Sequence, residues 1–119
     1  MSKIPLTPAV LDKLADRFKA LAEPNRLAIL AQLRKGERSV GELVDETGLG
    51  QANVSKHLNM LHRYGFVERR KEGLNVYYSL GDQDVFRICD LMCGRLEQEV
   101  RDLRGLVAGG ARRGAVRRA

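Results

Sequence analysis

The stretch from Gln51 to Tyr64 carries the side chains with the clearest capacity for molecular recognition. Its apolar residues recur at i, i+4 and i+7, which predicts a helix with one buried face. On the opposite face lie small, amide and cationic groups, with a further amide and a hydroxyl to either side. Amides can pair with adenine, hydroxyls with several base edges, and lysine or arginine with guanine or phosphate. The outward residues include no acid: Ala52, Asn53, Ser55, Lys56, Asn59 and Arg63.

Position along this helix divides the expected contacts. The N-terminal residues of such a helix usually reach the base edges, so we expect its first half to read bases. That half contains Gln51, Ala52, Asn53, Ser55 and Lys56. Arg63 lies at the other end and is expected to touch a phosphate. The alternative is a merely solvated helix face, which we disfavour because this helix also follows a glycine turn and precedes a predicted hairpin.

Two cysteines form the second group of residues that could bind a ligand. Cys89 and Cys93 are one helical turn apart, with their Cβ atoms about 5–6 Å apart on one face. A disulfide needs about 3.5–4.5 Å, so we do not expect an intrahelical bridge. Two thiolates at this spacing could hold a soft ion, whereas arsenite prefers three and would need a ligand from a partner chain or a small thiol. The alternative is that both cysteines are small buried hydrophobes.

Four helices are expected to precede residue 65. The first begins near Pro8 and ends before Pro24, which opens the second. Ser39 and Glu42 have the spacing of a capping box, so a short third helix spans roughly Val40 to Thr47. A glycine turn at 48–50 then leads into the helix described above.

A β-hairpin should follow, with strands at 66–70 and 75–80 joined by a turn at 71–74. Its cations Arg69, Arg70 and Lys71 could simply protect an edge strand. Beside a helix that reads DNA, we favour a clamp on the flanking minor groove or backbone. A last helix from near Asp82 to about Val107 has an apolar stripe near a 3.5-residue spacing, which suits a partner helix.

Helix, glycine turn, helix and basic hairpin occur in the order of a winged helix-turn-helix. We therefore predict a mainly α fold with a small β-hairpin, made of about five helices and a two-stranded wing. One DNA-binding and dimerisation domain is expected over residues 1–108, followed by a flexible basic Gly/Arg tail at 109–119.

The charge balance and composition narrow the class of protein. The net charge is +6, but four arginines lie in 109–119, where no acid occurs, so the rest of the chain carries only +2. The segment from Gly50 to Ser79 carries a local net charge of +3 and is the basic part of the domain.

We expect no membrane association and a cytoplasmic location, because no segment resembles a membrane span or a signal peptide. No enzyme is expected, since both histidines, His57 and His62, lie on one helix and no nucleophile or phosphate-loop motif occurs.

Three segments carry a resemblance to a known family: Phe18–Leu30, Val54–Leu58 and Val76–Tyr78. On these segments the chain resembles the ArsR/SmtB family of metal- and thiol-responsive repressors. The resemblance implies a homodimer joined through the first and last helices, which binds a palindromic double-stranded DNA operator and is released by an inducer. It also implicates Gln51, Ser55 and His57 in DNA contact, although Gln51 and His57 lie only about 60° from the buried face.

Two differences between this sequence and the family pattern limit the kinds of inducer that we expect. Residues 39–45 contain no cysteine where the family's third-helix motif has them, and Arg95 and Gln98 stand where the last-helix zinc site needs ligands. We therefore expect no required cofactor and an inducer at Cys89 and Cys93: As(III), another soft metal ion, or a reactive sulfur or oxidant signal. The competing hypothesis is a winged-helix DNA-binding or protein-interaction module without an effector site.

Overall fold

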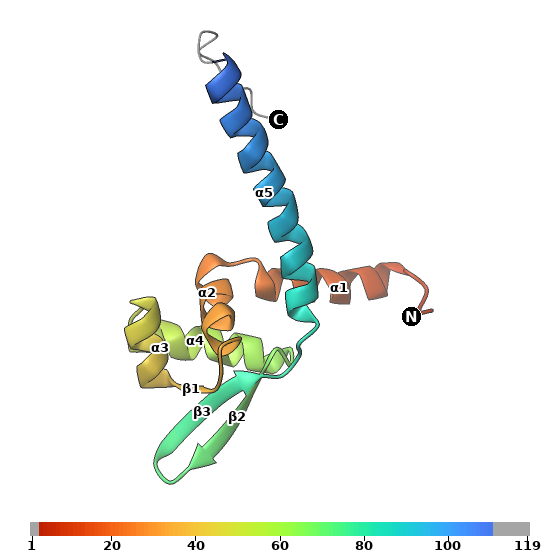
Figure 1. Ribbon diagram of the computed structural model, residues 1–119. Coiled ribbons are helices and arrows are strands. Elements are labelled where there is room, and N and C mark those ends of the chain that lie inside the picture. The colour runs from red at the N-terminus through yellow and green to blue at the C-terminus, as the bar shows by residue number, and fades with distance from the viewer. Residues whose placement is uncertain (1–2, 111–119) are drawn as a thin grey trace. The chain divides into compact units, whose positions relative to one another are not determined.

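The computed structural model describes residues 3–110, with side chains described as far as Val107 (Figure 1). The chain divides into two compact units, the first ending at Asp82 and the second beginning at Gln83. The first unit holds four helices and a small sheet, and the second holds one long helix.

The helices of the first unit are α1 (Pro8–Leu21), α2 (Pro24–Leu33), α3 (Val40–Thr47) and α4 (Gln51–Arg63). Prolines open α1 and α2, as predicted. Thr7 caps α1 by accepting a hydrogen bond from the amide of Val10 at 3.3 Å. The predicted capping box is present at α3: Ser39 Oγ accepts from the amide of Glu42, and the carboxylate of Glu42 accepts from the amide of Ser39. Local sequence signals therefore suffice to place these helix starts.

A tight turn joins α3 to α4. Gly48 adopts a left-handed conformation with φ of 76°, and its amide donates to the carbonyl of Val44. Glycine reaches this conformation without the steric cost that a Cβ imposes. The two helices thus form the predicted helix-turn-helix.

The sheet has three antiparallel strands in the order β1 (Arg38–Ser39), β3 (Asn75–Leu80), β2 (Val67–Glu72). The hairpin was predicted, but its turn is tighter than expected: Lys71 and Glu72 continue β2, and only Gly73 and Leu74 form the turn, with Gly73 at φ of 63°. A positive φ at the first turn residue suits a two-residue hairpin. Figure 1 shows the hairpin extending beyond the helices, with its turn at the far end.

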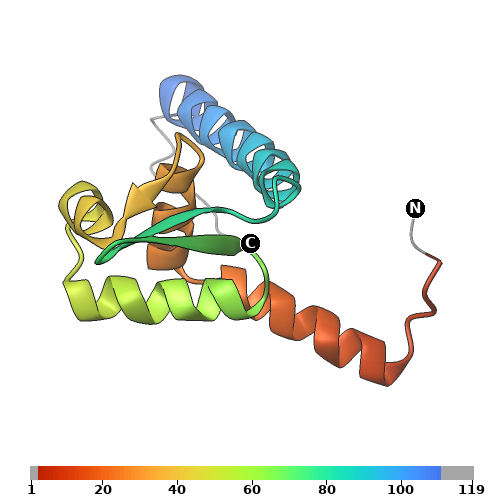
Figure 2. The ribbon, with the colours of Figure 1, turned by 90° about the horizontal axis from the view of Figure 1, so that it is seen from below.

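The core lies between the helices and the sheet. α4 runs alongside the hairpin and packs against β2 (Figure 2). In the first unit, the fully buried large side chains come from three helices and the first residue of β2: Ile29, Leu30, Leu43, Val54, Leu58, Leu61 and Val67. In α1, by contrast, only Ala20 is buried.

The second unit contains α5 (Val85–Gly110). This helix begins at Val85, so Asp82 does not occupy the N-cap position predicted for it, and the helix includes Gly109 and Gly110, the first two residues of the predicted tail. Residues 111–119, where the rest of the predicted flexible tail falls, lie outside the described residues. Side chains from Asp90 to Val107 are exposed in the single chain. Among the described residues, no helix is long and apolar enough to cross a membrane.

Candidate nucleic-acid interface

The outward face of α4 matches the predicted stripe closely. Six of the predicted residues are exposed, and Ser55 is half-buried. None of the six makes a side-chain hydrogen bond or ion pair within residues 3–110, so their polar groups are available to a ligand. The six residues that we call the outward face are Gln51, Ala52, Asn53, Lys56, Asn59 and Arg63.

The N-terminus of α4 also suits an anion. Gly50 occupies the N-cap position, and within the described residues no side chain caps this end and no acid lies in the first turn. The first amides of a helix are unpaired and carry the positive end of the helix dipole, which favours a phosphate. At the other end of the helix, Arg63 places a cation in the last turn.

His57 departs from the other predicted contact residues because it is buried, with 9% of its surface exposed. Its Nδ1 lies 3.3 Å from Nη1 of Arg26, and its Nε2 lies 3.5 Å from Oε2 of Glu23. Glu23 is the N-cap of α2, where its carboxylate accepts from the amide of Arg26. Neither partner of His57 was predicted from the sequence. The position of His57 near the buried face of the helix was the one signal that its side chain could contact the protein interior.

The carboxylate of Glu23 is held ionised by this arrangement. Desolvation raises its pKa, but the amides of Asn25 and Arg26 donate hydrogen bonds to it and the charge of the Arg26 guanidinium lies nearby, and both lower the pKa. The net effect is a pKa below the usual value of 4.5.

The three cations of the wing divide into two groups. Arg69 and Lys71 are exposed, and neither has an ion pair within residues 3–110. Arg70 instead forms a two-point ion pair with Glu37, with Nη2 to Oε1 at 2.7 Å and Nε to Oε2 at 3.1 Å. It also pairs with Glu72, and its guanidinium lies 4.9 Å from the centre of the Tyr77 ring. Arg70 therefore braces the hairpin, which leaves Arg69 and Lys71 as the cations open to DNA.

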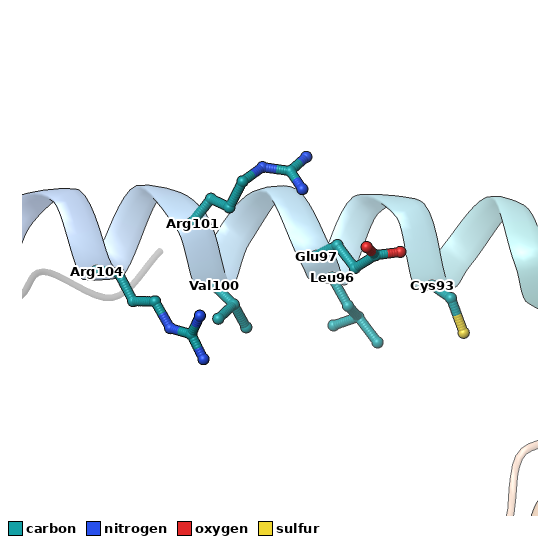
Figure 3. Close-up of a pocket in the computed structure, with 6 residues that line it drawn as sticks. All are labelled: Cys93, Leu96, Glu97, Val100, Arg101 and Arg104. Atoms are coloured by element: carbon teal, nitrogen blue, oxygen red, sulfur yellow. The ribbon is translucent and has the colours of Figure 1, made fainter.

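The two cysteines lie one turn apart on α5, and they form no disulfide. Cys89 is half-buried, and Cys93 is exposed at one end of a shallow groove. Figure 3 shows Cys93, Leu96 and Val100 on one side of the helix, with Arg101 directed away from them. Residues 3–110 contain no group of three or more histidine, cysteine or carboxylate side chains placed to hold a metal ion.

The helix-turn-helix, the sheet and the outward face together define a winged helix-turn-helix regulator. Residues 23–69 match the model of the bacterial regulatory protein arsR family. The chain belongs to this family: it is 36% identical over 102 residues to the "Uncharacterized HTH-type transcriptional regulator Rv0081" of Mycobacterium tuberculosis, an alignment that covers 82% of this chain and 90% of that protein.

Solved structures agree with this assignment. The crystal structure of Rv0081 matches with a TM-score of 0.70 at 34% identity, covering 81% of this chain and 96% of that one. The solution structure of the homodimeric winged helix-turn-helix DNA-binding domain Mb0332, fragment 1–100 from Mycobacterium bovis, matches with a TM-score of 0.71 at 34% identity, covering 86% and 95%. These relatives are regulators rather than enzymes, in agreement with the prediction from sequence.

A third relative carries a more specific name. The "Probable mercury resistance operon repressor" of Streptomyces lividans is 41% identical over 81 residues, which cover 68% of this chain. The match spans 62% of the length of that repressor, so its activity is not transferred to this chain as a whole.

Proposed function

We propose that this chain is a transcriptional repressor that binds palindromic double-stranded operator DNA as a homodimer in the cytoplasm. The observation that carries the proposal is the outward face of α4, which is exposed, polar and without a carboxylate. Its location after a glycine turn and beside a basic hairpin is that of a helix that enters the major groove.

The contacts divide along the interface. The first half of α4 reads base edges, with Asn53 and Lys56 as its strongest hydrogen-bonding groups. Arg63 contacts the phosphate backbone, and Arg69 and Lys71 on the wing hold the flanking DNA. Phosphate contacts position the protein, while base contacts specify the sequence.

Homodimerisation would supply the twofold symmetry of a palindrome. Two helices expose apolar faces that a second copy would bury: Leu11, Leu14 and Phe18 on α1, and Met92, Leu96, Val100 and Leu103 on α5. A run of exposed large apolar side chains on one helix face marks a protein contact more often than a solvated surface. The relative Mb0332 is itself homodimeric, which supports the proposal.

The inducer is proposed to be a thiophilic species that binds Cys89 and Cys93. Thiolates bind soft metal ions in preference to hard ones, and one relative is named for a mercury resistance operon. An ion that needs three thiolates, such as arsenite, would take its third ligand from the partner or from a small thiol. Arg95 and Gln98, where the family's zinc site has ligands, disfavour zinc.

The test of DNA binding begins with selection of a preferred duplex from a random pool by the full chain. Kd for that duplex is expected on the order of 10⁻⁸ to 10⁻¹¹ M and should rise by about 10³-fold between roughly 50 and 200 mM salt. Lys56→Ala should relax preference at one base position, at a cost of about 1–3 kcal/mol. Lys13→Ala, which removes the same charge from the exposed side of α1, is the matched control. Failure to select any sequence, or salt-independent binding, would refute the proposal and favour a protein-interaction module.

The inducer site is tested by replacing Cys89 and Cys93 together with serine. The variant should bind the selected duplex as the wild type does, because neither thiol lies on the DNA-binding elements. Release of DNA by mercuric ion, arsenite or a persulfide should be lost. A double variant that still responds to every species that releases the wild type would show that the cysteines only pack.

A further inference from the structure

The cluster of His57, Glu23 and Arg26 joins the buried side of α4 to the connection between α1 and α2. We propose that this cluster positions α4 for DNA binding, and that His57 acts as a positioning residue rather than as a reader of bases. The inference rests on the proposed function of DNA binding and adds to it a residue that acts through the orientation of the helix.

The burial of the imidazole argues against base contact. His57 is one of the four buried residues of α4, although it keeps 9% of its surface exposed while Val54, Leu58 and Leu61 keep none. Both ring nitrogens face partners within the protein, Nδ1 toward Arg26 and Nε2 toward Glu23. A base edge would therefore have to displace an internal contact to reach this ring.

The partners also specify the protonation state of the ring. A guanidinium only donates hydrogen bonds, so the contact with Arg26 requires an unprotonated Nδ1. The proton of the neutral ring then lies on Nε2 and is directed toward the carboxylate of Glu23. Protonation of Nδ1 would place two donors against each other and break the bond between Arg26 and His57, while leaving the contact with Glu23.

Arg26 extends the cluster to α1. Its Nε donates to the carbonyl of Ala20 at 2.6 Å, and its Nη2 donates to the carbonyl of Lys19 at 3.2 Å. Both carbonyls belong to the last turn of α1, and the carbonyl of Lys19 also accepts from the amide of Ala22 at 3.2 Å. One guanidinium thus connects the end of α1 with the side chain of His57, so that a shift of α1 is passed directly to α4.

The charged groups that approach the ring are few in the described residues. The α1–α2 connection contributes the Glu23 carboxylate, and α2 contributes the Arg26 guanidinium. Lys19 approaches the cluster through its carbonyl, Lys56 on α4 faces outward, and His62 lies five residues along the same helix. Because the pKa of Glu23 lies below its usual value, this carboxylate is ionised at neutral pH.

The decisive experiment compares affinity and base preference for the duplex selected with the wild-type chain and for its single-base variants. His57→Ala should weaken binding about tenfold across all of these duplexes, with the order of preference unchanged. Lys56→Ala, as a reader variant, should instead change preference at one position. Arg26→Lys keeps the charge but cannot make three contacts at once, so it should also weaken binding uniformly. Thermal melts identify any variant that does not fold. If His57→Ala does not fold, Arg26→Lys and His57→Asn still test the inference.

Rescue by a conservative variant separates positioning through this hydrogen bond from general packing. His57→Asn places a carbonyl oxygen near the location of Nδ1, where it can accept from Arg26. His57→Asn should therefore recover most of the affinity that His57→Ala loses, with the order of base preference unchanged. His57→Leu fills the space without an acceptor and should not recover it.

Each outcome decides between the alternatives. A base-specific change in His57→Ala would identify His57 as a reader and overturn the inference. Equal affinity in His57→Asn and His57→Leu would overturn it as well. If the wild-type chain selects no duplex, the proposed function of DNA binding is wrong. If it selects a duplex but the His57 variants behave otherwise than expected, only the inference about His57 is wrong.

Discussion

Arg70 of the wing and Glu37, which immediately precedes β1, form a two-point ion pair across the sheet. The planar guanidinium matches the two oxygens of the carboxylate, a geometry that lysine cannot reproduce. Glu72 and the ring of Tyr77 complete the surroundings of Arg70. The pair ties the hairpin to the segment that leads into the helix-turn-helix, in addition to the backbone pairing of β1 with β3.

Low pH should therefore weaken the ion pair between Arg70 and Glu37. The hydrogen bond from Arg70 holds the pKa of Glu37 below its usual value of 4.5, against a smaller opposing effect of desolvation. A lowered folded-state pKa stabilises the protein above the unfolded-state pKa, and this contribution is lost as pH falls through the folded-state pKa. The wild type should have a slightly higher Tm than Glu37→Gln at pH 7, since exposed pairs contribute little. The difference should shrink in melts recorded below pH 4.5.

Glu68→Gln serves as the control for that series. Glu68 lies on β2, the strand that also carries Arg70. It is exposed and has no ion pair within residues 3–110. A dependence on pH as large in Glu68→Gln as in Glu37→Gln would mean that general charge, and not this ion pair, governs the acid response.

The wing cations should differ in their contribution to DNA binding. Replacing Arg69 or Lys71 with alanine should weaken binding uniformly across sequences and reduce the slope of log K against log salt by about one for each residue. Arg70→Ala should instead lower affinity with little change in slope, because its charge is already paired. Filter binding or fluorescence anisotropy at several salt concentrations measures both quantities. Equal slopes for all three variants would show that Arg70 also contacts phosphate.

Local signals in the sequence predicted much of this fold. The capping box, the glycine after α3 and the alternating residues of β3 each act within a few positions, so their effects are visible without the tertiary structure. β1 was missed because two residues are too few to show a periodic pattern. Its pairing with β3 depends on a strand almost 40 residues away.

The candidate site was predicted less evenly. The outward face of α4 follows from helical geometry alone, since Val54, Leu58 and Leu61 determine which side is buried. The pairing of Arg70 with Glu37 joins residues 33 positions apart, and the contact of Arg26 with His57 spans 31. Nothing in local sequence indicates such pairings, so a cation that braces the fold looked the same as one that faces DNA.

The capping box offers a direct test of helix α3. Ser39→Ala removes the acceptor for the amide of Glu42, so one amide loses its partner at the start of the helix. Loss of an N-cap side chain costs about 0.5–2 kcal/mol of stability. Urea unfolding at pH 7 measures the change, and Ser39→Asp, which retains an acceptor, should recover most of it. A Ser39→Ala variant as stable as the wild type would mean that solvent replaces the cap at no cost.

The apolar face of α5 should control the oligomeric state. Leu96 is 56% exposed in the single chain, and burying such a side chain contributes about 1.5–3 kcal/mol for each of two protomers. Leu96→Glu should therefore shift the dimer toward monomer in analytical ultracentrifugation and weaken operator binding at least about tenfold, because a monomer engages one half-site. Gln98→Glu adds the same charge about 200° around the helix and should leave the dimer intact. If Leu96→Glu sediments as the wild type does, the dimer forms without this face, and Phe18→Glu then tests whether α1 alone supplies the interface.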